Sequence, residues 1–536
     1  MVKFETISDN ILAIAKRLGF NGDGDSKNGI FRQYSDSRGY LAFINPDESE
    51  SGPYSGLSFV VFPLYDDSSY HYCVVSICIG RNNLGDDLEL ASLPYLRRSF
   101  RKMTKGDVVR SDFPNIYLTT DFTDVTTPST KLFEDLETLA KEWGSDDSLK
   151  TINSYKTVLP AARIVRFTND DVYDAEKVDS RINRSGNAIN GYDVLIGWLA
   201  QYAKIRKWEY RKGKAYDRQD KLSGMICEDD QYSSTAMLDE NGVPEEVENL
   251  LNEKKYIVLQ GAPGTGKTYT ANQLSKEFEK VFFEQFHAET TFSDFVGGIR
   301  PVLNSKEIGY EYHEGKLTEA IVEAINLENK GKKVLLIIDE INRANLSNVL
   351  GPVFYLFEGN VNSKNDRKGK VQLHLSNSHR INDYDDTKYT VVKDKDYVEL
   401  SALPSNLYVI ATMNTADRSL AVVDFALRRR FAWYTLKPHE PVQLDNSLHF
   451  CKEEFHKVGE FFEKYATDEE MNLQPGQSYF IVNNGTELQI KEAMKKRMIY
   501  EIMPLMKEYF ANGLMLKAQD EFADYYHLYT NQFMYL

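Results

Sequence analysis

The segment Gly-Ala-Pro-Gly-Thr-Gly-Lys-Thr at residues 261–268 constrains the fold of this chain more than any other feature. This spacing is typical of a phosphate-binding loop (P-loop), in which backbone N–H groups surround phosphate oxygens at the start of a helix. An apolar run at 256–260 precedes the loop, and a helical pattern at 269–279 follows it. An ordinary glycine-rich turn is the alternative, but these flanks favour a parallel α/β domain that binds a nucleotide.

The P-loop also predicts individual roles. Lys267 is expected to reach the β- and γ-phosphates, and the Thr268 hydroxyl to bind Mg²⁺. The other predicted nucleotide contacts are Gly261, Ala262, Pro263, Gly264, Thr265, Gly266 and Tyr269. The predicted cofactor is therefore Mg²⁺. The substrate is either GTP or ATP, because the pocket for the base has no universal sequence pattern.

A pair of carboxylates, Asp339 and Glu340, follows the apolar run 334–338. Ligands of open parallel sheets collect at the carboxyl ends of the strands. Asp339 is therefore expected to hold Mg²⁺ through water, and Glu340 to polarise the attacking water. Two acidic residues after a strand are often only surface groups, but their position downstream of a P-loop favours the catalytic interpretation.

A third apolar run, 407–412, leads to Asn414. Its amide can orient water or contact the γ-phosphate, and the alternative is an asparagine that caps a turn. Further along, Arg428, Arg429 and Arg430 end a helical segment. They form either a solvated helix end or a source of positive charge for a γ-phosphate, often that of a neighbouring subunit.

The rest of the chain indicates several domains around this core. Residues 1–225 predict a mixed α+β domain with a helix at 1–20, strands at 57–64 and 70–79, and helices at 130–143 and 193–208. The predicted boundaries are 1–225 for this domain, 226–245 for a polar linker, 246–436 for the P-loop core and 437–536 for a small α-helical lid. Short apolar runs at 256–260, 281–286, 334–338 and 407–412 predict buried parallel strands of the core.

Charge and composition limit the possible partners. The net charge of −16 argues against a uniformly basic nucleic-acid binder. Residues 1–225 carry 30 Lys and Arg against 32 Asp and Glu, so most of the excess lies in the remainder. One basic run, 204–221, contains interleaved aromatic residues. This composition is typical of a nucleic-acid-binding site, and the alternative is a solvated helix end. The candidate DNA contacts are Lys207, Arg211, Lys212 and Lys214.

The four cysteines show no metal-ligand spacing and predict no disulfide framework. No apolar run approaches the roughly 18 residues that a membrane helix needs, and the first residues do not form a secretory signal. The sequence therefore favours a cytoplasmic protein without a membrane partner.

Longer motifs resemble the McrB-like family, the AAA+ motor subunits of McrBC-type (type IV) modification-dependent restriction systems. The resemblance extends over about residues 250–515. It is carried by Phe-His-Ala-Glu-Thr-Thr-Phe-Ser-Asp-Phe at 286–295, Gly-Ile-Arg-Pro at 298–301, Ile-Ile-Asp-Glu-Ile-Asn-Arg-Ala-Asn at 337–345, Met-Asn-Thr-Ala-Asp-Arg-Ser at 413–419, Leu-Arg-Arg-Arg-Phe at 427–431 and Gln-Ser-Tyr-Phe at 477–480.

The resemblance implies an AAA+ core that hydrolyses nucleotide (GTP in the characterised branch) within a ring, expected to be a hexamer. It further implies a separate McrC-like nuclease and an N-terminal domain that reads modified DNA. Asn414 becomes the sensor, Arg429 or Arg430 the finger that acts on a neighbouring subunit, and Asp417 and Arg418 the link to the partner. Asn342, Arg343 and Asn345 extend the acidic motif.

Two observations qualify the resemblance. Residues 476–480 contain no second sensor arginine, an absence that McrB-like proteins share. Residues 1–225 match nothing specific, so their target stays open. The rival functions are a protein-remodelling ATPase of the dynein-related or MoxR kind and a nucleotide-gated switch with negligible turnover. The segment at 413–419 favours the restriction motor. The chain shows no convincing nuclease motif, so DNA cleavage is expected to need the partner.

Overall fold

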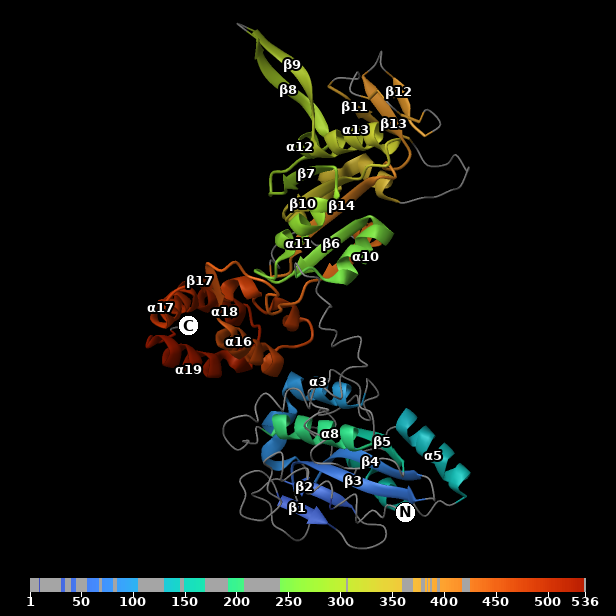
Figure 1. Cartoon of the computed structure of the whole chain (residues 1–536), viewed down its shortest axis with the longest axis vertical. Helices are drawn as coiled ribbons and strands as arrows, with labels where there is room; N and C mark the ends of the chain where they lie inside the picture. Colours follow the sequence, from blue (N-terminus) through green and yellow to red (C-terminus); the bar gives the residue numbers. More distant parts are fainter. Residues whose placement is uncertain are drawn as a thin grey trace. The chain divides into compact units, whose positions relative to one another are not determined.

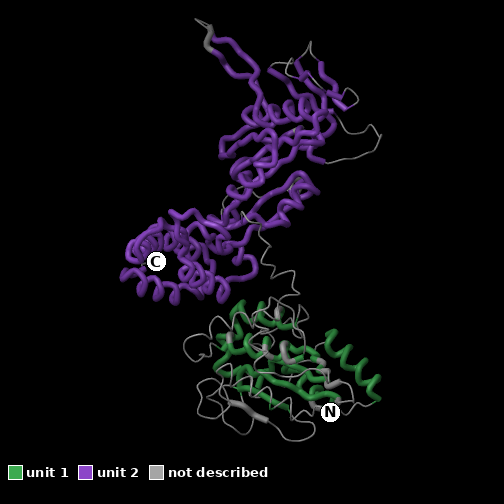
Figure 2. Tube along the Cα trace, viewed as in Figure 1, with its two compact units in different colours: residues 1–235 green, residues 236–536 purple. Residues whose placement is uncertain are grey.

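A computed structural model describes residues 9, 30–33, 40–44, 55–66, 70–80, 84–104, 130–144, 149–168, 191–206, 242–304, 307–358, 370–376, 381–382, 384–385, 388–392, 396–416 and 425–534. The chain divides into two compact units, residues 1–235 and 236–536 (Figure 2). The predicted helix at 1–20, apart from Asp9, and the predicted linker up to residue 241 lie outside the described residues.

The first unit contains an antiparallel sheet with the strands in chain order (Figure 1). These strands are β1 (Ile30–Gln33), β2 (Leu41–Ile44), β3 (Leu57–Asp66), β4 (Tyr70–Ile79) and β5 (Ala161–Thr168). The predicted strands at 57–64 and 70–79 are β3 and β4. They form a hairpin whose register shifts between Pro63 and Tyr65.

Helices complete the core of the first unit. They are η1 (Gly85–Asp87), α2 (Leu88–Ala91), α3 (Pro94–Met103), α5 (Lys131–Trp143), α6 (Lys150–Ser154), η4 (Lys156–Val158) and α8 (Gly191–Ile205). The helix predicted at 193–208 is α8, and it has an apolar face on which Leu195, Trp198, Leu199 and Tyr202 are at most 2% exposed. Since α3 and α8 pack against each other and against β5, this face is buried by tertiary contacts.

The second unit holds a five-stranded parallel sheet in the order β15-β6-β14-β10-β7. Its strands are β6 (Tyr256–Gly261), β7 (Lys280–Gln285), β10 (Val334–Asp339), β14 (Leu407–Asn414) and β15 (Ala432–Thr435). Four of them match the positions of the predicted apolar runs, and the sheet confirms the α/β core, but the burial predicted for β7 is wrong, because this edge strand has no buried residue. β15 carries no such run, since all four of its residues are half-buried.

Helices cover both faces of this sheet because successive strand residues point to opposite sides. α10 (Glu245–Lys254) and α11 (Lys267–Leu274) share an apolar cluster with Ile257 and Leu259. α13 (Lys316–Glu328) and α14 (Leu346–Leu350) cover the opposite face of the sheet. They pack with Val258 and with residues of the neighbouring strands that point to the same face, such as Leu336 and Val409. The helix predicted at 269–279 is shorter than expected, because after Leu274 the chain tightens into the 3₁₀ turn η5 (Ser275–Glu277).

Two additions to the core were not predicted. A hairpin of β8 (Gly297–Asn304) and β9 (Glu307–Glu314) extends away from the parallel sheet (Figure 1). A small antiparallel sheet joins β11 (Val371–His374), β12 (Thr390–Val392) and β13 (Tyr397–Leu400). The remaining core elements are α12 (Phe292–Phe295), η6 (Ile341–Arg343), η7 (Gly351–Phe357) and α15 (Phe425–Arg430).

Residues 437–536 have an apolar core of their own, in which Phe455, Phe462, Met498, Met506 and Phe522 are buried. Its helices are α16 (Lys452–Tyr465), α17 (Glu487–Arg497), α18 (Met503–Ala511) and α19 (Gln519–Thr530), with shorter turns η10 (Glu470–Leu473), η11 (Gln477–Phe480) and η13 (Leu516–Ala518). The helices α17 and α18 follow each other without a break, joined by a π-helical turn, η12 (Met498–Ile502). The purely helical expectation also missed two short paired strands, β16 (Leu448–Phe450) and β17 (Ile481–Asn483).

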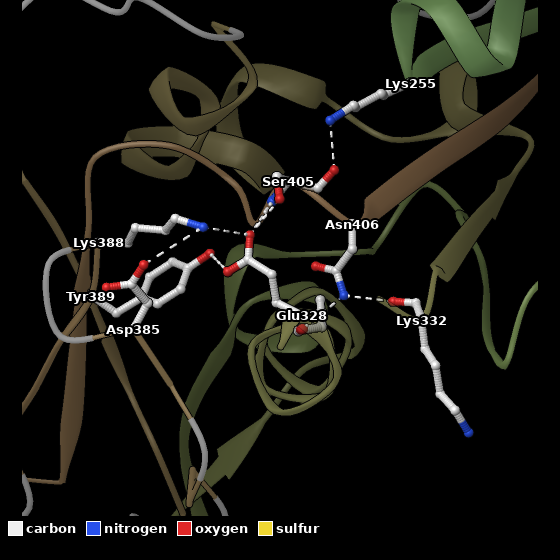
Figure 3. A network of polar contacts seen from close by, with 9 residues as sticks. Lys255, Glu328, Lys332, Asp385, Lys388, Tyr389, Ser405 and Asn406 are labelled. Carbon is white, nitrogen blue, oxygen red and sulfur yellow. Dashed lines mark hydrogen bonds and ion pairs between the residues drawn. The ribbon is translucent and has the colours of Figure 1, made fainter. Parts of the chain in front are cut away.

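A polar network fixes the edge of the core opposite the P-loop (Figure 3). The Glu328 side chain, at the end of α13, is 9% exposed. Its carboxylate accepts hydrogen bonds from the Tyr389 hydroxyl at 2.8 Å and from Ser405, and Lys388 lies 3.4 Å away. Burial alone would raise the pKa of Glu328, but these hydrogen bonds and the Lys388 charge outweigh it, so the pKa lies below its ordinary value.

Replacing Glu328 by glutamine should therefore destabilise the core in a pH-dependent way. A lowered carboxyl pKa stabilises the fold above the unfolded-state value of about 4.3, and this contribution is lost as the pH falls through the folded-state pKa. We expect Glu328→Gln to lower the free energy of opening β14 by about 1–2 kcal/mol at pH 7. Amide hydrogen exchange of β14 would measure this loss, with Glu323→Gln on the same helix as control. A loss that persists undiminished near pH 3 would contradict the assignment.

Among the described residues, no helix combines the length and apolarity needed to cross a lipid bilayer.

Candidate nucleotide-binding site

The predicted motifs meet at one edge of the parallel sheet. In the sheet β14 lies between β6 and β10, so the three strands that end in the predicted site residues are direct neighbours. Asn414, the last residue of β14, stands opposite Gly261, the last residue of β6. The P-loop, the acidic pair and Asn414 therefore gather where parallel strands place their ligands.

The P-loop has the backbone geometry that the glycines predicted. Gly264 and Gly266 adopt φ values of 78° and 87°, a left-handed conformation that favours glycine. Gly261 lies so close to the chain that an added Cβ would be 2.5 Å from the Leu436 carbonyl oxygen. The Lys267 ammonium donates to the carbonyl oxygens of Gly261 and Ala262 at 3.0 and 2.9 Å. Its positive charge is thus held at the loop, beside the start of α11.

The residues predicted to hold Mg²⁺ are in direct contact. The Thr268 hydroxyl donates to a carboxylate oxygen of Asp339 at 3.2 Å. A second hydroxyl, that of the buried Thr412, donates to the same oxygen at 2.6 Å. A hydroxyl and a carboxylate are hard oxygen ligands, so Thr268 and Asp339 suit Mg²⁺ that is also bound by phosphates and water.

Thr412 is a site residue that the sequence analysis missed. Besides contacting Asp339, its hydroxyl oxygen accepts a hydrogen bond from the Glu340 backbone N–H at 3.1 Å. One side chain on β14 thereby orients both acidic residues that end β10. The only sequence signal is a threonine two positions before Asn414, which places both on the same face of the strand.

Glu340 has a backbone conformation that is rare for a non-glycine residue, with φ 55° and ψ 47°. Such a conformation costs about 1–3 kcal/mol, and it persists only where the surrounding structure holds it. The Glu340 carboxylate lies 3.5 Å from the Arg343 guanidinium, and its side chain is 21% exposed. The conformation is held by the Thr412 hydrogen bond and by this ion pair.

Asn414 is tied to the loop beside it. Its side-chain oxygen accepts from the Ala416 backbone N–H at 3.3 Å, and the Thr415 N–H donates to the Gly261 carbonyl at 3.0 Å. Asn414 therefore caps the turn that follows β14, as the alternative interpretation predicted. It also lies next to the first P-loop residue, which is the position that the sensor role requires.

The arginines of α15 differ in their surroundings. Arg430 pairs with Glu358, lies 4.2 Å from the centre of the Phe354 ring, and leaves only 8% of its side chain exposed. Arg428 lies over Trp433, with its guanidinium 5.4 Å from the ring centre. Arg429 is exposed, and it borders an open cavity of about 380 Å³. The cavity is lined by Ser347, Gly351, Phe354, Tyr355, Glu358, Arg429 and Arg430.

The residues that extend the acidic motif are part of the scaffold. Asn342 is buried within η6, and the Asn345 side chain accepts from the Asn348 N–H at the start of α14. Asp417 and Arg418 lie outside the described residues.

The predicted DNA contacts Lys207, Arg211, Lys212 and Lys214 also lie outside the described residues. Arg206, which belongs to the same basic run, is described. It forms an ion pair with Asp87 at 2.5 Å, and both side chains are at most 8% exposed. At least one cation of the basic run therefore belongs to a structural ion pair.

Comparisons with known proteins agree with this geometry. The family model described as "AAA domain (dynein-related subfamily)" matches residues 256–431. The chain is 34% identical over 279 residues to the "Type IV methyl-directed restriction enzyme EcoKMcrB subunit" of Escherichia coli strain K12, covering 48% of this chain and 55% of that protein. It is 30% identical over 210 residues to the "Type II restriction enzyme BsuMI component YdiS" of Bacillus subtilis strain 168, covering 34% and 56%.

A solved structure of a candidate ATPase from Cytophaga hutchinsonii ATCC 33406 overlaps with 44% of this chain and 55% of that chain at 16% identity. Its TM-score of 0.23 defines no shared fold.

The fold and the family match define the class, since residues 256–431 form an AAA domain with a P-loop nucleotide site. More particularly, over the matched segments the chain is similar to McrB-like AAA+ restriction subunits, in agreement with the resemblance drawn from the motifs. The chain spans about half the length of the curated relatives it matches.

Proposed function

We propose that this chain is the nucleotide-hydrolysing AAA+ motor of a DNA restriction complex. The observation that carries the proposal is the contact of Thr268, Thr412 and the two acidic residues beside the P-loop. These groups have the chemistry needed to hold Mg²⁺ and to orient a water molecule at a γ-phosphate. Both curated relatives bear the names of restriction-enzyme components, which supports the biological setting.

Each residue has a role that follows from its position. Lys267 neutralises the β- and γ-phosphates, and Thr268 with Asp339 holds Mg²⁺, which supplies charge neutralisation on the phosphates. Glu340 orients the attacking water, assisted by Asn414 on the neighbouring strand. The exposed Arg429 supplies positive charge to the nucleotide of the next subunit in a ring, for which we propose a hexamer.

The rest of the proposal concerns partners. A separate McrC-like nuclease would cut DNA, with Asp417 and Arg418 coupling the motor to it. The N-terminal unit would bind DNA through Lys207, Arg211, Lys212 and Lys214. Since the chain as a whole is acidic, such binding has to be local and sensitive to salt. The second candidate is a protein-remodelling ATPase, which the dynein-related family match favours. Failure of the full chain to bind modified or unmodified DNA at low salt would favour this second candidate.

The test of the proposed activity is Mg²⁺-dependent phosphate release from ATP and from GTP. Lys267→Ala should weaken nucleotide binding by about 10- to 100-fold, because a charge-assisted contact contributes roughly 1.5–3 kcal/mol. Lys276→Ala, on the turn after α11, is the matched control and should bind as the wild type does. Calorimetric titration gives both affinities, and full affinity in Lys267→Ala would exclude the P-loop as the phosphate site.

A further inference from the structure

A short segment of residues 437–536 lies directly on the P-loop, although it is more than 200 positions away in sequence. The N–H groups of Gly476 and Ser478 donate to the carbonyl oxygens of Pro263 and Gly264 at 2.9 and 3.2 Å. Between them, the Gln477 side-chain amide donates to the Thr265 carbonyl at 3.1 Å. We name residues 476–478 the lid strap. Its three donors cap three consecutive carbonyl groups of the P-loop.

The contact is too close for ordinary side chains. A Cβ added to Gly476 would be 2.1 Å from the carbonyl carbon of Gly264, and one added to Gly264 would be 2.4 Å from the Ser478 hydroxyl oxygen. The two glycines therefore allow the backbones to meet. Gln477 itself is 9% exposed, and its side-chain oxygen accepts a hydrogen bond from the backbone N–H of His439 at 3.4 Å.

The geometry of the peptide bond connects this contact to phosphate binding. In a trans peptide unit the C=O and the following N–H point in opposite directions. Capping the carbonyls of Pro263, Gly264 and Thr265 from outside therefore turns the N–H groups of Gly264, Thr265 and Gly266 inward. These inward N–H groups are the ones that a P-loop offers to phosphate oxygens.

We propose that the lid strap orients the P-loop for phosphate binding and that Gln477 is its positioning residue. This inference rests on the proposed function, because it assigns the strap to the same nucleotide site. The strap contacts carbonyl groups and not the ligand, so it acts on the triphosphate regardless of the base. It stabilises ground state and transition state alike, so its loss raises KM and leaves kcat nearly unchanged.

The test uses the full chain with Gln477→Met, which keeps the length and apolar volume of the side chain but removes the donor. The hydrogen bond to Thr265 is the side-chain contact of Gln477 that touches the P-loop, and its loss, of roughly 0.5–1.5 kcal/mol, should weaken the binding of ATP, GTP and inorganic tripolyphosphate by the same factor, about 3- to 10-fold. KM should rise by that factor while kcat changes less than about 2-fold. Gly476→Ala should weaken the binding of all three ligands by at least about 30-fold, because the added methyl group separates the lid strap from the P-loop.

The matched control is Gln489→Met, since Gln489 caps α17 of the same domain through hydrogen bonds with Thr486, away from the P-loop. It should keep wild-type affinities. Unchanged tripolyphosphate affinity in Gln477→Met, or a loss confined to one of the two nucleotides, would overturn the inference and indicate a base contact instead. If the wild-type chain binds no nucleotide, the proposed function itself is refuted. Failure of the lid-strap inference is therefore distinguishable from failure of the proposed function.

Discussion

Glu340→Gln is expected to bind nucleotide with nearly wild-type affinity and to hydrolyse it at least ~100-fold more slowly. Glutamine keeps the size and one oxygen of the side chain but cannot accept a proton from the attacking water. The ion pair with Arg343 is lost in this variant, but the hydrogen bond from the Glu340 main-chain N–H to Thr412 should persist and keep the backbone conformation. The variant should therefore accumulate in the nucleotide-bound state.

Steady-state phosphate release and calorimetric affinity, measured on the same preparation, separate the two effects. Glu253→Gln, on the exposed face of α10, is the control for loss of a carboxylate. Hydrolysis by Glu340→Gln within a few-fold of the wild-type rate would remove Glu340 from the catalytic role.

Arg429→Ala should reduce hydrolysis by the assembled protein by about 10³-fold or more, the usual effect of losing an arginine finger. The structure favours Arg429 over Arg430 because Arg430 is already paired with Glu358 and packed on Phe354 in its own subunit. Arg430→Ala should instead lower the stability of the core, since it leaves the Glu358 carboxylate without this partner. Arg428→Ala should cost less than about 10-fold.

Mixing Arg429→Ala subunits with Glu340→Gln subunits tests whether the arginine acts between subunits. Some mixed interfaces then pair an intact Glu340 with an intact Arg429, so part of the activity should return. Light scattering with a slowly hydrolysed nucleotide should show a ring-sized species for both variants. No recovery at any mixing ratio would assign Arg429 to its own subunit.

The sequence alone predicted the chemistry of the site because each motif is local. A P-loop carries its own geometry, since its glycines permit the turn and its lysine opens the helix. Buried parallel strands are continuous apolar runs, so β6, β10 and β14 were visible within one or two residues of their ends. Because ligands collect at the carboxyl ends of parallel strands, the residues that follow these runs were expected to share one site.

Tertiary structure decided which groups meet across the chain. The pairing of Arg430 with Glu358 joins residues 72 positions apart, and the Gln477–Thr265 hydrogen bond joins residues 212 apart. No local periodicity encodes such contacts, because they depend on how separate elements pack. The same reason explains why the contacts of Thr412 with Asp339 and Glu340 were missed. Sequence determined the reactive groups of this protein, and packing determined which of them are oriented, buried or left exposed.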